Sequence, residues 1–129
     1  MTRTKLLKFW PALLFLPLFA ACGGGGGEAV DQVPPTIVDR SPALGASGVP
    51  LGTQITVTFS EAVDPASVDN TSFSLEESGL STPVSATVSI SADNLTATLT
   101  PDSALSVSTI YQVTVSTAVT DLAGNALLE

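Results

Sequence analysis

Histidine is absent from this 129-residue sequence, and cysteine occurs only once, at Cys22. Without histidine the chain cannot build a Ser–His–Asp or Cys–His catalytic group, and a zinc site would lack its usual soft ligands. A single cysteine also excludes a framework of intramolecular disulfides. We therefore expect a non-enzymatic protein with no catalytic residues and no cofactor.

Basic residues are scarce as well. The sequence has 4 Lys and Arg residues against 12 Asp and Glu residues, and three of the four bases lie in the first eight positions. Arg40 is the only base that follows them. Because an acidic surface repels phosphate backbones, we expect no nucleic-acid partner.

The N-terminus has the three parts of a secretory signal peptide. A short basic segment leads into an apolar run at residues 9–19, and the small residues Ala20 and Ala21 follow. The run is shorter than the about 20 residues that a helix needs to cross a bilayer. We therefore expect export across the cytoplasmic membrane rather than a membrane-spanning helix.

The residues Phe19-Ala20-Ala21-Cys22 resemble the lipobox of bacterial lipoproteins. The resemblance implies cleavage between Ala21 and Cys22 and attachment of lipid to the Cys22 sulfur, which would anchor the chain to a membrane. Phe19 stands where the lipobox usually has leucine. The lack of aspartate after the cysteine implies the outer membrane or the cell surface as the location. Acylation with two or more chains is enough for stable anchoring.

A glycine run at residues 23–27 follows the cysteine. Glycine has the most backbone freedom to lose on folding, so this stretch predicts a disordered tether. The sequence thus divides into a lipoprotein signal peptide at residues 1–21, a lipidated cysteine and Gly-rich linker at residues 22–33, and one domain at residues 34–129.

The domain consists of short segments in which apolar and polar residues alternate, separated by turn residues. The segments are residues 36–39, 54–60, 72–76, 84–90, 95–99 and 110–115. Alternation with threonine on the outside gives each strand one buried and one hydrated face. We predict an all-β fold, an immunoglobulin-like antiparallel β-sandwich of about seven strands, with a helical turn capped by Asp64 at residues 64–68. Tyr111, at the start of its strand, stands where a sandwich often has a tyrosine whose hydroxyl hydrogen-bonds to the backbone, and the alternative is a simple buried aromatic.

The domain resembles the bacterial Ig-like domain named after the S-layer protein SbsA. The matching pieces are residues 34–38, 41–50, 55–65, 111–115 and the turn at 121–125. The resemblance implies a spacer or binding module of surface proteins. It also implies a further strand after residue 125, which is missing or stunted here, and an open sheet edge could then accept a strand from another chain.

Calcium is the one metal for which the sequence offers candidates, since its ligands are oxygens. Glu61 and Asp64 follow one predicted strand, and Asp121 and Asn125 lie in the late turn. The alternative is that these residues only stabilise turns, with Gly124 at positive φ.

Our leading hypothesis is a cell-envelope lipoprotein that displays an Ig-like spacer or interaction module. Its partner would be an envelope protein or a polysaccharide. The alternative is the N-terminal fragment of a larger surface enzyme or of a calcium-dependent adhesin.

Overall fold

The computed structural model describes residues 29–80 and 82–128. The signal peptide, Cys22 and the glycine run predicted from the sequence lie outside these residues. A compact unit spans Asp31–Glu129. In the part of the chain that is described, no helix is long and apolar enough to cross a membrane.

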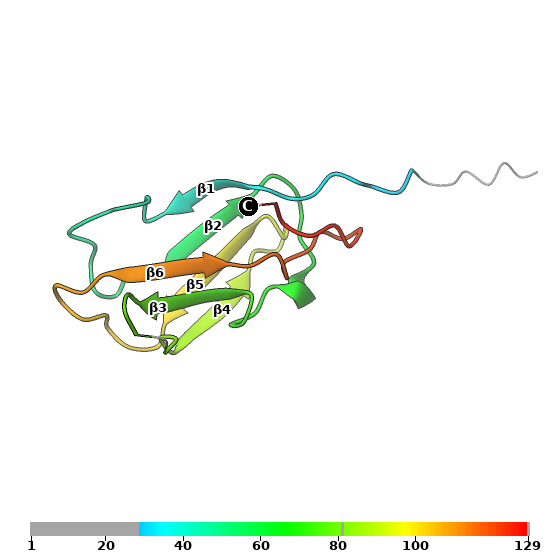
Figure 1. Ribbon diagram of the computed structural model, residues 1–129. Coiled ribbons are helices and arrows are strands. Elements are labelled where there is room, and N and C mark those ends of the chain that lie inside the picture. The colour runs from blue at the N-terminus through cyan, green and yellow to red at the C-terminus, as the bar shows by residue number, and fades with distance from the viewer. Residues whose placement is uncertain (1–28, 81, 129) are drawn as a thin grey trace, which may run out of the picture. The chain divides into compact units, whose positions relative to one another are not determined.

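Within the described residues of this unit there are six strands and one short 3₁₀ helix (Figure 1). The elements are β1 (Ile37–Ser41), β2 (Ile55–Phe59), η1 (Pro65–Ser67), β3 (Phe73–Glu77), β4 (Ala86–Ile90), β5 (Thr96–Pro101) and β6 (Tyr111–Val115). The strand bounds differ by at most two residues from the segments predicted by alternation.

The strands form two sheets. One has four strands in the order β1-β2-β5-β4, and the other has two, β3 and β6. All the pairings between these strands are antiparallel. The prediction of an all-β, antiparallel Ig-like sandwich is therefore confirmed.

The core lies between the sheets and follows from the alternation in the sequence. On β2, Ile55, Val57 and Phe59 are 6%, 3% and 2% exposed, whereas the two threonines between them are half-buried. Phe73 and Leu75 of β3, together with Ala97 and Leu99 of β5, are buried in the same cluster. Full burial of one large apolar side chain contributes about 1.5–3 kcal/mol. Period-two patterning thus accounts for both the strands and their buried faces.

Two local predictions are confirmed. Asp64 caps η1, because its Oδ1 accepts a hydrogen bond from the N–H of Ala66 at 2.9 Å. Tyr111 at the start of β6 accepts a hydrogen bond on its hydroxyl from the N–H of Ser106 at 2.9 Å. The second bond is the backbone contact that the sequence predicted for a tyrosine in this position of a sandwich.

The chain that follows β6 forms only isolated bridges in the described residues. Thr120 bridges Ala126, and Leu128 makes a parallel bridge to Thr36, next to the start of β1. Leu127 is 2% exposed and belongs to the core. In the described residues, the segment after residue 125 thus forms bridges and no named strand, and two strands face four across the sandwich.

Candidate functional site

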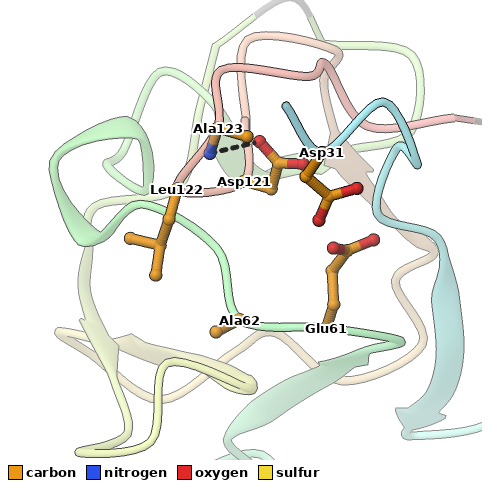
Figure 2. Close-up of a pocket in the computed structure, with 6 residues that line it drawn as sticks. All are labelled: Asp31, Glu61, Ala62, Asp121, Leu122 and Ala123. Atoms are coloured by element: carbon orange, nitrogen blue, oxygen red, sulfur yellow. Dashed lines mark hydrogen bonds between the residues drawn. The ribbon is translucent and has the colours of Figure 1, made fainter. Parts of the chain in front are cut away.

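Three carboxylates meet at one end of the sandwich, on Asp31, Glu61 and Asp121, which we call the acidic cluster. One oxygen from each lies within 4.8 Å of the others. Ala62, Leu122 and Ala123 complete the lining of a pocket at this place (Figure 2). Figure 2 shows the carboxylates of Asp31 and Glu61 facing each other, with Asp121 beside Asp31.

Pairing between two loops brings the cluster together. Glu61 lies two residues beyond the end of β2, and the next residues pair with the segment after β6. Val63 forms an antiparallel bridge with Asp121, and the N–H of Asp64 donates to the carbonyl of Thr120 at 2.8 Å. Because Val63 is fully buried, this pairing is part of the core and holds Glu61 close to Asp121.

Asp121 is fixed by the turn that it begins. It is 3% exposed, and its Oδ1 accepts hydrogen bonds from the N–H groups of Ala123 and Asn125, both at 2.8 Å. Its Oδ2 accepts from Nδ2 of Asn125 at 2.7 Å. Gly124 takes a φ of +91°, as the sequence predicted for this turn. The carboxylate therefore has little freedom to turn away.

Asn125 also ties Asp31 to this turn. Its Nδ2 donates a second hydrogen bond, of 2.9 Å, to the backbone carbonyl of Asp31. The Asp31 carboxylate in turn accepts from the N–H of Val33 at 2.9 Å. One amide side chain thus orients two of the three acidic residues of the cluster.

The acidic cluster brings negative charges together, and the described residues that line its pocket include no basic side chain. Burial, followed by the charges of Asp31 and Asp121, raises the pKa of Glu61 above its ordinary value. Burial also acts to raise the pKa of Asp121, but the hydrogen bonds from Asn125 and the turn N–H groups outweigh it and lower that pKa. Arg40, the only base after residue 8, belongs to β1 and is not part of the pocket lining. The neighbouring negative charges therefore raise the pKa of Glu61 in the same direction as burial does.

The structure brings two of the four calcium candidates from the sequence into the acidic cluster and gives the other two different roles. Glu61 and Asp121 come together in the acidic cluster. Asn125 positions the other residues through its amide nitrogen, and Asp64 uses its carboxylate to cap η1 and is not in the cluster. Sequence reasoning missed Asp31, because it lies in the segment assigned to the linker. Only its position just before the first strand could have indicated a role.

Chemically, the cluster is a set of hard, anionic oxygen donors. Such donors suit Ca²⁺, which takes six to eight oxygens at about 2.3–2.6 Å. Three carboxylates supply at most six oxygens, and carbonyls or water would complete the shell. The arrangement of these carboxylates is therefore one that could hold a cation.

The comparisons with known proteins agree with this architecture. The model of the family described as bacterial Ig-like domain matches residues 31–129. A search of curated proteins finds no match. Bacterial Ig-like domains are generally non-catalytic.

Solved structures of an S-layer protein are similar in fold and sequence. The crystal structure of the S-layer protein rSbsC(31-844) superposes with a TM-score of 0.56 at 28% identity, covering 74% of this chain and 12% of that chain. The N-terminal part of the bacterial S-layer protein SbsC gives a TM-score of 0.55 at 28% identity, covering 74% of this chain and 21% of that chain. This chain thus spans a small part of the length of these neighbours.

Together with the two antiparallel sheets, the match over residues 31–129 shows that the chain belongs to the bacterial Ig-like domain family.

Proposed function

We propose that this chain is a lipid-anchored envelope protein that displays one Ig-like spacer or interaction module at the cell surface. The proposal is supported by the order of the parts: residues 31–129 match a bacterial Ig-like domain and are similar to S-layer protein structures, and the sequence before them resembles a signal peptide with a lipobox. The partner would be an envelope protein or a polysaccharide. The module would act without chemistry of its own.

The order of the parts supports the proposal. Cys22 is the only cysteine, and it follows the predicted signal peptide and precedes a glycine run. A lipidated residue at this place would leave the glycines and residues 28–30 as a tether between the membrane and the domain. Such a coil of eight residues would have a root-mean-square reach of about 14–17 Å, which would hold the domain off the bilayer without fixing its orientation.

Metabolic labelling with radioactive palmitate tests the anchor. We expect the parent chain to carry label and to enter the membrane fraction, and Cys22→Ser to lose both. Phe19→Leu, which restores the usual lipobox residue, serves as the control and should remain labelled. Label retained on Cys22→Ser would contradict the proposed anchor.

A second candidate function is calcium binding, and the convergence of Asp31, Glu61 and Asp121 favours it. Isothermal titration with CaCl₂ should then give heat with the parent chain. The variant Asp31→Asn/Glu61→Gln should give none, whereas Glu77→Gln on β3, outside the cluster, should behave as the parent. The absence of heat and of any shift in melting temperature in the parent would exclude this function.

A further inference from the structure

The four-stranded sheet has two outer strands, β1 and β4, and they differ in how their edges are protected. β1 carries the charged residues Asp39 and Arg40, and its register with β2 is irregular between Ile37 and Asp39. Charged side chains and bulges hinder pairing between the sheet edges of different molecules. β4 has neither a charged residue nor a proline, and its register with β5 is regular. The edge of β4 is therefore open to pairing with another strand.

The edge of β4 is far in the strand order from the last described residues. The order is β1-β2-β5-β4, so β1 and β4 lie at opposite ends of this sheet. Leu128 bridges Thr36, which lies directly before β1. The β4 edge is thus formed by internal strands alone.

Hydrogen bonds on the β5 side show which backbone groups of β4 point outward. The carbonyl of Ser85, just before β4, and the N–H of Ser91, just after it, each form a 2.9 Å bond with the segment 96–102. The direction of the backbone groups alternates along a strand, so those of Ala86, Val88 and Ile90 point away from β5. Within residues 29–80 and 82–128, these three residues make no backbone hydrogen bond outside the strand ladders. Their N–H and C=O groups are available to a further strand.

The side chains of β4 are divided between the two faces of the sheet. The residues with outward-pointing backbone groups have half-buried side chains that pack against the core. Thr87 and Ser89 are exposed on the opposite face. A pocket opens beside this strand, and its lining includes Phe73, Leu75 and Ala86. The sheet of β3 and β6 therefore covers the apolar side of β4 only in part.

The sequence of β4 is complementary to itself when two copies run antiparallel. With Val88 opposite Val88 of the second copy, Ala86 faces Ile90, and Thr87 faces Ser89. Apolar residues then meet apolar residues and hydroxyls meet hydroxyls, which are favourable cross-strand pairs. In this register the residues with outward-pointing backbone groups lie opposite one another, so each such pair exchanges two backbone hydrogen bonds.

Charge favours a second copy as the occupant of this edge. The chain has 12 acidic residues and 4 basic ones, so most approaches of two copies bring like charges together. Pairing through β4 avoids this repulsion within the paired strands, because the strand is uncharged. A strand with a charged residue facing Val88 would desolvate that charge without a partner, which is costly.

We propose that the edge of β4 pairs antiparallel with β4 of a second copy of this chain, with Val88 opposite Val88, so that the two four-stranded sheets join into one. The inference goes beyond the proposed function, because it requires neither the lipid anchor nor a bound cation. A pair of five-residue strands is small beside a standard interface, which buries about 1,200–2,000 Å². The dimer should therefore be weak, with a Kd of about 0.1–1 mM.

Sedimentation equilibrium of the full chain in density-matched detergent tests the pairing. Val88→Lys and Val88→Glu should each weaken the dimer by about tenfold, because each places like charges directly opposite one another. An equimolar mixture of the two variants should recover the dimer, since lysine on one copy then faces glutamate on the other. Val38→Lys, at an exposed valine of the outer strand β1, is the matched control and should dimerise as the parent.

Disulfide cross-linking tests the register. In the proposed pairing, Thr87 and Ser89 of the two copies form a non-hydrogen-bonded pair with Cα atoms about 4.5 Å apart, within the range that a disulfide spans. The same position in both copies is a diagonal pair about 7–8 Å apart, which is too far. Oxidation of mixed Thr87→Cys and Ser89→Cys chains should therefore give a cross-linked dimer on non-reducing gels, and either variant alone should not. The parent, with Cys22 alone, gives the background.

Three results would overturn the inference. They are a parent chain that stays monomeric at millimolar concentration, an unaltered dimer in Val88→Lys, and equal cross-linking by Thr87→Cys alone and by the mixture. Circular dichroism checks that each variant keeps its strands. Palmitate labelling is independent of all three results, so failure of the anchor and failure of the strand pairing are distinguishable.

Discussion

The hydroxyl of Ser67 accepts a hydrogen bond from the backbone N–H of Thr120 at 3.0 Å, across 53 residues of sequence. The same hydroxyl donates to the carbonyl of Asp64 at 2.7 Å. One side chain of the η1 turn thus fixes the segment after β6, which carries Asp121. Loop pairing and the acidic cluster both depend on this contact.

Ser67→Ala should destabilise the domain by about 1–3 kcal/mol, because the half-buried N–H of Thr120 loses its acceptor. Urea unfolding followed by circular dichroism measures the change. The exposed Ser103→Ala is the matched control and should unfold with the parent. Equal midpoints for Ser67→Ala and the parent would show that water replaces the hydroxyl without cost.

Tyr111→Phe removes the acceptor of the Ser106 N–H and keeps the ring. Since this N–H belongs to an exposed residue that can bond to water, the expected loss is about 0.5–1.5 kcal/mol. Thermal unfolding measures it. A loss similar to that of Tyr111→Ala would mean that the ring contributes nothing beyond its hydroxyl.

Phe73→Ala should cost about 3–5 kcal/mol, because Phe73 is fully buried at the start of β3 and its removal leaves a cavity. For a domain of this size the loss is a large part of the total stability. Denaturant unfolding is the measurement. Ser74→Ala, at the next position on the outer face, should change the midpoint little.

Asp69 should make the stability of the domain depend on pH in the acidic range. Hydrogen bonds from the Thr71 hydroxyl, and then from the N–H groups of Ser72 and Thr71, lower its pKa to about 2. An unfolded aspartate has a pKa of about 3.9, so the stabilisation is complete above that value and is lost as the pH falls from about 4 to about 2. Melting temperatures of the parent and Asp69→Asn should therefore differ at neutral pH and converge towards pH 2.

Ionisation of Glu61 should have the opposite effect on stability from ionisation of Asp69. Its pKa is raised in the folded state, so the charged carboxylate lowers stability once the pH exceeds that raised value. Glu61→Gln should therefore melt at a higher temperature than the parent at neutral pH in the presence of a chelator, and equally in acid. With Ca²⁺ bound, the order should invert, because the ion would compensate the charge. A lower melting temperature for Glu61→Gln in chelator would contradict this account.

Much of the fold could be predicted from the sequence, because alternation ties each strand to a buried face. The set Ile55, Val57 and Phe59 is an example, since period two and burial coincide there. The cap on η1 and the bond of Tyr111 were also predictable, because each depends on a local pattern of residues.

The site was less predictable, because its parts are distant in sequence. Glu61 and Asp121 were candidates on loop position alone, and the bridge between Val63 and Asp121 that joins them is not visible in any local pattern. Asp31 was missed because a residue beside a linker is recognised only through its tertiary contact with Asn125.

The parallel bridge between Thr36 and Leu128 has a mechanical consequence. A pull on the chain before Thr36 and an opposing pull after Leu128 act along the two paired segments in opposite directions. The bond from Leu128 to Pro35 is then loaded in shear together with the contacts of buried Leu127, instead of being peeled open one bond at a time. If the domain were anchored before Thr36 and held by a partner after Leu128, the tension would pass through these two paired segments.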